Sequence, residues 1–222
     1  MTHMTGKGST LVLVLIAALA AAGGAWLGTR LFAPDAAESA GREVPALDVA
    51  TVLPEAKALE AFDLIDFERN SFTRDQMKDR WTFVMIGYTY CPDVCPFTLA
   101  HLNTVDKLLE GSDLGKDTSF LFISVDPRRD DPERIKDYVG FFNRDFFGVT
   151  GEPEALTRLS RDLGLIFEVP ESPESEDYAV GHSAYVALIG PNADIQAYFR
   201  PPFEPPKMVD AYRRIREFRS PS

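Results

Sequence analysis

Two cysteines, the only ones in the chain, lie four residues apart, and each is followed by a proline. They stand where an apolar run of strand length, Trp81–Tyr88, gives way to a helical pattern. Such a run is typical of a strand that is buried on both faces. Because Pro96 has no N–H group, the helix that follows must begin near Val94 or Cys95. The thiols of Cys91 and Cys95 are therefore predicted to lie on a loop that leads into a helix N-terminus.

The rest of the pattern alternates strands and helices. A short hairpin is predicted at residues 62–66 and 71–73, and strands at residues 119–125, 183–189 and 194–199. Helices are predicted at residues 95–109, 152–163 and 206–218, and another opens at Asp131-Pro132-Glu133. The apolar side of the first helix comprises Leu99, Leu102, Val105, Leu108 and Leu109. This order favours an α/β fold with a mixed sheet flanked by helices. The thioredoxin fold has the same order, with its reactive cysteines after the first core strand.

The N-terminal part of the chain is predicted to be a membrane anchor. Residues 10–32 form an apolar run that is long enough to cross a bilayer as a helix, which takes roughly 20 residues. Lys7 favours a cytoplasmic tail at residues 1–9, so we expect a single pass through the inner (plasma) membrane and a C-terminal domain on the periplasmic side. A cleaved signal peptide is the alternative. Residues 33–56 resemble a flexible tether, and residues 57–220 are assigned to the folded domain.

Charge narrows the range of partners. The formal net charge is −11, from 23 basic and 34 acidic residues. An acidic domain repels phosphate backbones, so no nucleic acid is expected as a partner. The apolar content of 45% is sufficient for a packed core and excludes a chain that is disordered throughout.

The position of the two cysteines predicts chemistry rather than packing. Unpaired N–H groups and the positive end of a helix dipole stabilise a thiolate, which is both the nucleophilic and the metal-binding form of cysteine. A buried disulfide or two inert core thiols are the alternative. His182 is the candidate third ligand, because it precedes a predicted core strand at the point where thioredoxin-like oxidoreductases place a proline facing the cysteines. A packing role is its alternative. His101 is expected on a solvated helix surface, and His3 in the cytoplasmic tail.

Three aspartates follow the strand predicted at residues 119–125. Asp126 lies at the strand end, where functional residues gather in α/β folds. Its carboxylate is a candidate to hydrogen-bond a ligand residue and orient it, or to accept a proton. The alternative is that Asp126 only starts an Asp-Pro turn. Asp130 and Asp131 are predicted to cap the helix that follows.

Three segments of the chain resemble the Sco/SenC family of copper-binding proteins. They are GYTYCPDVCP at residues 87–96, SVDPRRDDPE at residues 124–133 and YAVGHS at residues 178–183. The chain departs from the family pattern at Gly181, where an acidic residue is common, and at residues 190–193, where Asp-Pro-x-Gly is more usual. The resemblance implies a membrane-tethered, thioredoxin-like protein that carries copper for the CuA centre of cytochrome c oxidase.

The ligand types agree with copper. Two thiolates and one imidazole, from Cys91, Cys95 and His182, make a three-coordinate site in which thiolates favour Cu(I) and the imidazole also allows Cu(II). Zinc is the competitor, because two cysteines and one histidine can form an open zinc site. The expected partners are a copper donor chaperone and the oxidase subunit that carries the CuA site. The protein is thus expected to be an assembly factor rather than an enzyme.

The alternative function is thiol–disulfide exchange. In that reading the protein is an oxidoreductase that keeps the CuA-site cysteines of the partner reduced. Its own oxidised form would contain a Cys91–Cys95 disulfide, which cannot hold copper. A peroxidase is a weaker third reading, because peroxiredoxins lack this cysteine pair and histidine segment.

Overall fold

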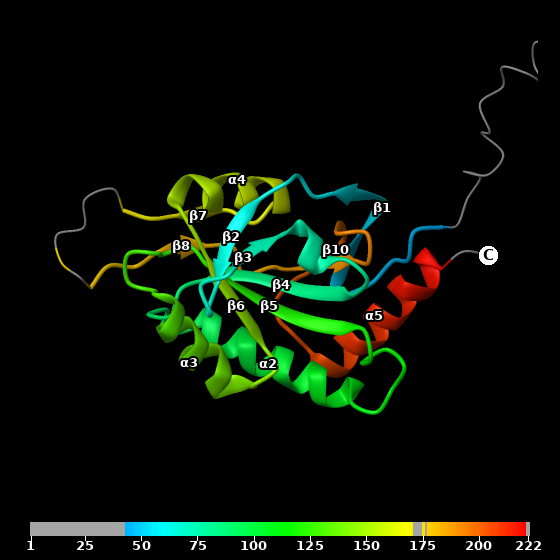
Figure 1. Cartoon of the computed structure of the whole chain (residues 1–222). Helices are drawn as coiled ribbons and strands as arrows, with labels where there is room; N and C mark the ends of the chain where they lie inside the picture. The colour runs from blue at the N-terminus through cyan, green and yellow to red at the C-terminus, as the bar shows by residue number, and fades with distance from the viewer. Residues whose placement is uncertain (1–42, 171–174, 176, 221–222) are drawn as a thin grey trace, which may run out of the picture. The chain divides into compact units, whose positions relative to one another are not determined.

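The computed structural model describes residues 43–170, 175 and 177–220, and the described residues from Val44 onward form one compact unit (Figure 1). The predicted tail at residues 1–9 and the predicted anchor at residues 10–32 lie outside the described residues. Within the described part, no helix combines the length and the apolar character needed to cross a membrane.

An eight-stranded mixed sheet forms the centre of the domain, in the order β1-β10-β9-β4-β5-β6-β2-β3. The central strands β4, β5 and β6 are parallel, and the outer pairs are antiparallel. All seven residues of β4 are buried, as predicted for a strand covered on both faces. The strands are β1 (Ala50–Ala58), β2 (Asp63–Asp66), β3 (Ser71–Thr73), β4 (Trp81–Gly87), β5 (Thr118–Ser124), β6 (Phe147–Thr150), β9 (Val186–Gly190) and β10 (Asp194–Phe199).

Helices cover both faces of this sheet, as Figure 1 shows. One face packs on α2 (Val94–Leu109), α3 (Pro132–Phe142) and α5 (Pro205–Arg219), and the other packs on α4 (Pro153–Leu163). A short 3-10 helix, η1 (Arg74–Met77), follows β3. Side chains alternate along the strands, so that Phe83 joins the core under α2 and α5 and Val84 joins the core under α4. The predicted α/β architecture with a mixed, helix-flanked sheet is confirmed.

Helix ends follow the sequence signals. Asp131 caps α3, because its carboxylate accepts a hydrogen bond from the backbone N–H of Arg134 at 2.8 Å. Gly164 ends α4 in the left-handed conformation, with φ of 68°. The first residue of α2 is Val94, as the proline pattern requires.

Some predicted boundaries were wrong. The tether does not extend to residue 56, because β1 begins at Ala50 and pairs with β10, although its register shifts between Val52 and Lys57. The strand predicted at residues 183–189 begins only at Val186. Leu108 is 48% exposed and lies outside the apolar face of α2, whereas Leu109 is buried.

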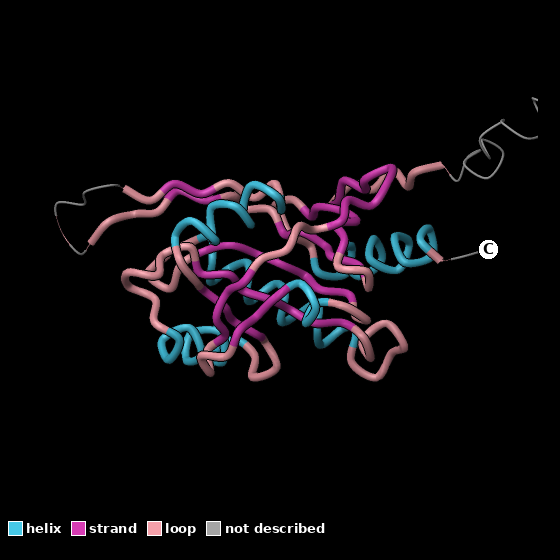
Figure 2. Tube along the Cα trace, turned by 45° about the horizontal axis from the view of Figure 1, so that its top comes forward, coloured by secondary structure: helices cyan, strands magenta, loops and turns pink. Residues whose placement is uncertain are grey.

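A second, two-stranded sheet carries the predicted histidine. It consists of β7 (Phe167–Glu168) and β8 (Gly181–His182), which run antiparallel beside each other in a long excursion of the chain (Figure 2). The backbone N–H of Ser183 donates to the carbonyl of Ile166 at 2.8 Å and extends this pairing. In the described residues, β8 therefore pairs with β7 and with no strand of the large sheet.

Candidate metal centre

The cysteine loop lies at the carboxyl end of β4, the central strand. The backbone N–H of Cys91 donates to the carbonyl of Tyr88 at 3.1 Å, which turns the chain toward α2. Cys95, in the first turn of α2, is fully buried, whereas Cys91 is partly exposed. Gly87 makes room for Cys95, because a Cβ atom at Gly87 would lie 2.4 Å from the Cys95 sulfur. The sulfur thus occupies space that any larger residue at position 87 would fill.

His182 completes a cluster of three donor atoms. Its Nε2 atom lies 3.3 Å from Sγ of Cys95 and 3.7 Å from Sγ of Cys91. The three donor atoms all lie within 4.8 Å of one another, and no other group of metal-ligand residues of this kind occurs in the described part of the chain. Nδ1 lies 3.0 Å from the carbonyl oxygen of Ser183. A proton on Nδ1 would be donated to that oxygen and would leave the Nε2 lone pair directed at the sulfurs.

The two thiols differ in proton affinity. The hydrogen bond from Cys95 is the largest influence on Cys91, and with bonds from His182 and nearby backbone it outweighs burial and lowers the pKa of Cys91 to about 4. The same hydrogen bond, together with burial, raises the pKa of Cys95 far above its usual value. The pair therefore holds one proton, on Cys95, while Cys91 is a thiolate. A thiolate next to an imidazole nitrogen is ready to bind a soft metal ion.

Asp126 is fully buried at the end of β5, but its hydrogen bonds go to neighbours rather than to the three donor atoms. Its carboxylate accepts from Nε of Arg129 at 2.6 Å and from the hydroxyl of Tyr178 at 2.7 Å. Burial and this hydrogen bond raise the pKa of Tyr178 to about 12, so the phenol remains a donor at neutral pH. The side chain of Asp126 therefore contacts Arg129 and Tyr178 rather than the three donor atoms.

Asp130 does not cap α3, contrary to the prediction. It is 1% exposed and accepts hydrogen bonds from the backbone N–H and the hydroxyl of Thr89, at 2.8 and 2.6 Å, and from the hydroxyl of Ser124 at 2.6 Å. Burial raises the pKa of Asp130. Its role, which is to fix the cysteine loop to β5, depends on contacts between distant segments, and the sequence carried no local signal of it.

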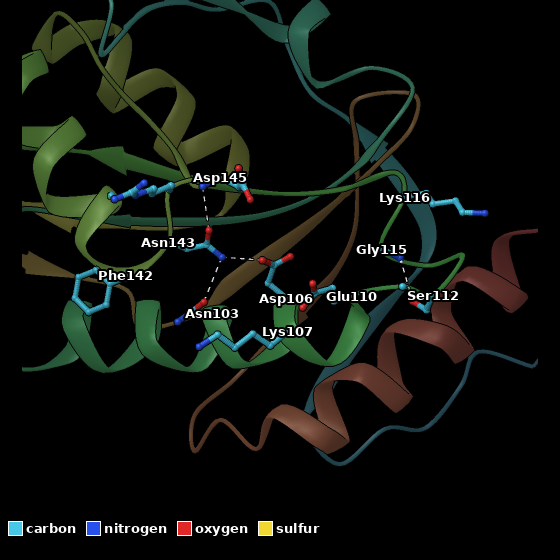
Figure 3. Close-up of a pocket in the computed structure, with 13 residues that line it drawn as sticks. Asn103, Asp106, Lys107, Glu110, Ser112, Gly115, Lys116, Phe142, Asn143 and Asp145 are labelled. Atoms are coloured by element: carbon cyan, nitrogen blue, oxygen red, sulfur yellow. Dashed lines mark hydrogen bonds between the residues drawn. The ribbon is translucent and has the colours of Figure 1, made fainter.

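Other candidate positions lie away from the centre. His101 is partly exposed on α2, with its ring 6.2 Å from that of Phe203 and outside the three-donor cluster. A cavity of about 660 Å³ lies between α2 and the end of α3 (Figure 3). There the side chain of Asn143 donates to the carboxylate of Asp106 at 2.7 Å and to Asn103 at 3.2 Å. None of the three donor residues lines this cavity.

Fold and site together define a class of protein: a thioredoxin-like α/β domain with a Cys–Cys–His centre at the carboxyl end of its central strand. The SCO1/SenC family model matches residues 51–217, so the chain belongs to the SCO1/SenC family.

Individual relatives agree with this assignment. A protein of Stutzerimonas stutzeri named "Putative copper-binding protein" is 36% identical over 171 residues, which cover 76% of this chain and 81% of the relative. The chain spans 47% of the longer mitochondrial SCO1 homolog 1 of Arabidopsis thaliana, at 32% identity.

Solved structures of relatives share the fold. Copper-bound ScoI of Arabidopsis thaliana is 30% identical with a TM-score of 0.65, covering 72% of this chain and 98% of that one. Copper-bound yeast Sco1 is 25% identical with a TM-score of 0.69, covering 75% and 92%. BsSco, described as a member of the Sco family of cytochrome c oxidase assembly proteins, shares the fold at 16% identity and a TM-score of 0.58, covering 75% and 96%.

Proposed function

We propose that the protein binds one copper ion through Cys91, Cys95 and His182 and carries it to another protein. The convergence of two sulfurs and one imidazole nitrogen within 4.8 Å is the observation that carries this proposal. Copper-bound structures of family members support the choice of metal.

The donor set favours copper over zinc. Thiolates are soft ligands that suit Cu(I), and an imidazole nitrogen also suits Cu(II). A closed structural zinc site takes four protein ligands, and the described residues bring together only three. Partial exposure of Cys91 leaves the centre open to an incoming ligand, as a carrier requires.

The recipient that we propose is the CuA centre of cytochrome c oxidase, loaded after a donor chaperone has supplied the copper. The description of the Sco family as cytochrome c oxidase assembly proteins supports this recipient. A single-pass anchor at residues 10–32 in the inner membrane, with the folded domain on the periplasmic side, would keep the carrier next to a membrane enzyme.

The metal proposal is tested by anaerobic copper titration of reduced and oxidised protein, with metal analysis. Cys91 and Cys95 are the only thiols, so the reduced form should bind about one copper per chain and the disulfide form almost none, because binding requires free thiolate. Equal binding by both forms would place the metal elsewhere and overturn the proposal.

A second function, thiol–disulfide exchange, is favoured by the asymmetry of the pair. Cys91 is partly exposed and has a pKa of about 4, as suits an attacking thiolate, whereas the buried Cys95 holds the proton, as suits a resolving thiol. In this reading the Cys91 thiolate attacks one sulfur of a partner disulfide, and the other partner cysteine leaves as a thiolate, which can take up the proton of Cys95. Cys95 then attacks the Cys91 sulfur of the mixed disulfide and releases the second partner cysteine. The partner disulfide is reduced while the Cys91–Cys95 disulfide forms.

His182→Ala separates the two functions. Two thiolates alone can still hold Cu(I), but the Cu(II) complex should lose its thiolate-to-metal charge-transfer absorption, and oxidase assembly in cells should fail. Disulfide reduction in vitro should continue, because exchange needs only the two thiols. Normal oxidase assembly with His182→Ala, alongside failure with Cys91→Ser, would favour the redox function instead.

A further inference from the structure

The side chain of Arg129 lies among three tyrosine rings beside the metal centre. Its guanidinium carbon is 3.5 Å from the ring centroid of Tyr178, 4.8 Å from that of Tyr90 and 5.5 Å from that of Tyr88. The side chain is only 4% exposed, and it forms a salt bridge with the fully buried Asp126 at 2.6 Å. A planar cation that is desolvated to this degree and stacked on aromatic faces has little freedom to move.

The rings that Arg129 contacts belong to the two separate halves of the centre. Tyr88 and Tyr90 are in the loop that carries the cysteines, whereas Tyr178 is in the segment that leads to β8 and His182. Tyr88 also meets the ring of His182 edge-on, with centroids 5.9 Å apart.

The two halves lack a shared β-ladder in the described part of the chain. The cysteine loop follows β4 of the large sheet, and β8 pairs only with β7. Side-chain contacts therefore supply the direct links between the imidazole segment and the cysteine loop in the described residues. Arg129 contacts both halves. One carboxylate oxygen of Asp126 accepts a hydrogen bond from Arg129, and the other accepts one from Tyr178.

We propose that Arg129 is a positioning residue for the metal centre, which holds the segment carrying His182 against the loop carrying Cys91 and Cys95. This inference rests on the proposed function, because it concerns the same centre. It assigns Asp126 an indirect role, which is to orient Arg129 and Tyr178. We expect the effect to fall on the imidazole ligand, because Cys95 lies in α2 and the backbone of Cys91 is hydrogen-bonded to the carbonyl of Tyr88.

The test compares Arg129→Lys with Arg216→Lys. Lysine keeps the positive charge beside Asp126 but cannot cover three rings with a planar face. Arg216 is a matched control, because it pairs with Asp117 at 2.6 Å and lies 5.5 Å from the ring centroids of Trp81 and Tyr212, outside the metal centre.

Reduced Arg129→Lys should bind Cu(II) about tenfold more weakly and show reduced charge-transfer absorption, while its affinity for Cu(I) stays within about twofold of the original. Arg216→Lys should bind both ions as the original chain does. In a His182→Ala background, Arg129→Lys should cause no further loss, because the ligand that it positions is already absent. The inference would be overturned if Arg129→Lys weakened the binding of Cu(I) and Cu(II) equally. It would also be overturned if Arg129→Lys weakened binding in the His182→Ala background as much as in the original chain.

A metal-free measurement separates this inference from the proposed function. In Arg129→Lys the amide of Ser183, which pairs with Ile166, should exchange its hydrogen at least about tenfold faster, while amides of β4 keep their rates. Arg216→Lys should leave Ser183 unchanged. If the original chain binds no copper but this selective change occurs, the copper function fails and the positioning role stands. Unchanged exchange at Ser183 would refute the positioning role whatever the metal does.

Discussion

At the scale of single residues, the two cysteines of the centre differ in burial and in pKa. Cys91 is partly exposed and gains hydrogen bonds that stabilise its thiolate, whereas Cys95 is buried and keeps its proton. Metal binding must displace that proton, so the affinity for a soft metal should rise with pH. In the proposed thiol exchange, the same inequality would make Cys91 the attacking thiol.

The pH dependence of alkylation tests this inequality. Because the pKa of Cys91 is about 4, its thiolate persists across neutral pH and is lost only as the pH falls through that value. The rate of iodoacetamide reaction at Cys91, followed by mass spectrometry, should stay within about twofold from about pH 8 to pH 6. Cys91→Ser, which leaves only Cys95, should react slowly throughout. Slowing of the Cys91 reaction by about tenfold per pH unit would indicate an ordinary thiol and contradict the assignment.

Gly87 provides a second test at this scale. Gly87→Ala would place a methyl group 2.4 Å from the Cys95 sulfur and 3.0 Å from the ring of Phe122. We expect it to lower the free energy of unfolding by about 1–3 kcal/mol, as overpacking does, and to weaken copper binding by displacing the sulfur. Gly140→Ala in α3 is the control, because a Cβ there meets nothing within 4 Å and a helix gains up to about 1 kcal/mol from alanine. Urea unfolding of both metal-free variants measures the difference, and an unperturbed Gly87→Ala would show that the sulfur lies elsewhere.

At the scale of secondary-structure elements, the buried carboxylate of Asp130 and the hydroxyl of Thr89 link the cysteine loop to β5 and to α3. Asp130, just before α3, accepts from Thr89 in the cysteine loop and from Ser124 at the end of β5. Nε of Arg134 in α3 donates to the Thr89 hydroxyl at 2.6 Å. The loop is thereby fixed to the sheet and to α3 at a single side chain.

Removal of the Thr89 hydroxyl tests this junction. Thr89→Val keeps the shape of the side chain but leaves an oxygen of the buried Asp130 without this donor. An unsatisfied buried group of this kind costs about 1–3 kcal/mol, so the free energy of unfolding should fall by that amount. Thr104→Val removes a hydroxyl from an exposed position of α2, where it donates to the carbonyl of Ala100, and should change stability by no more than about 0.5 kcal/mol. Equal effects of the two substitutions in chemical denaturation would argue against a special role for Thr89.

At the scale of the whole molecule, an acidic folded domain follows an apolar segment that the sequence predicts to be an anchor. We propose that this arrangement keeps the centre outside the cytoplasm. The cysteine pair would then work where thiols tend to oxidise, so the metal-binding form depends on a supply of reductant.

Topology can be measured with a reporter joined after Ser222. Alkaline phosphatase folds only where disulfides form, so its fusion should be highly active in cells. A green fluorescent protein that matures only in the cytoplasm is the complementary control, and it should remain dark at the same position. Bright fluorescence with an inactive phosphatase would reverse the proposed orientation.

The sequence predicted the parts of the fold that have strong local patterns. The buried run of β4, the proline that restricts α2 and the Asp-Pro start of α3 act within a few residues. In contrast, β6 has only four residues, and β1 contains charged residues and a register shift, so both depend on their neighbours in the sheet.

The three donor residues of the site were predicted from the sequence, but the residues that support them were not. Cys91, Cys95 and His182 belong to recognisable segments, and the structure brings their donor atoms together. The roles of Asp130 and Arg129 were not predicted, because each depends on side chains from distant segments that meet only in the folded chain.

The placement of His182 on its own small sheet has a consequence for protein engineering. The sulfurs lie at the end of β4 and in the first turn of α2, with Cys95 in the core and Cys91 packed against it, but the third ligand comes from a segment that shares no ladder with the large sheet in the described residues. Replacement of that segment, or of its single histidine by methionine or cysteine, would alter the ligand set without rebuilding the core. The fold thus offers a fixed dithiol platform on which metal preference can be redesigned from one segment.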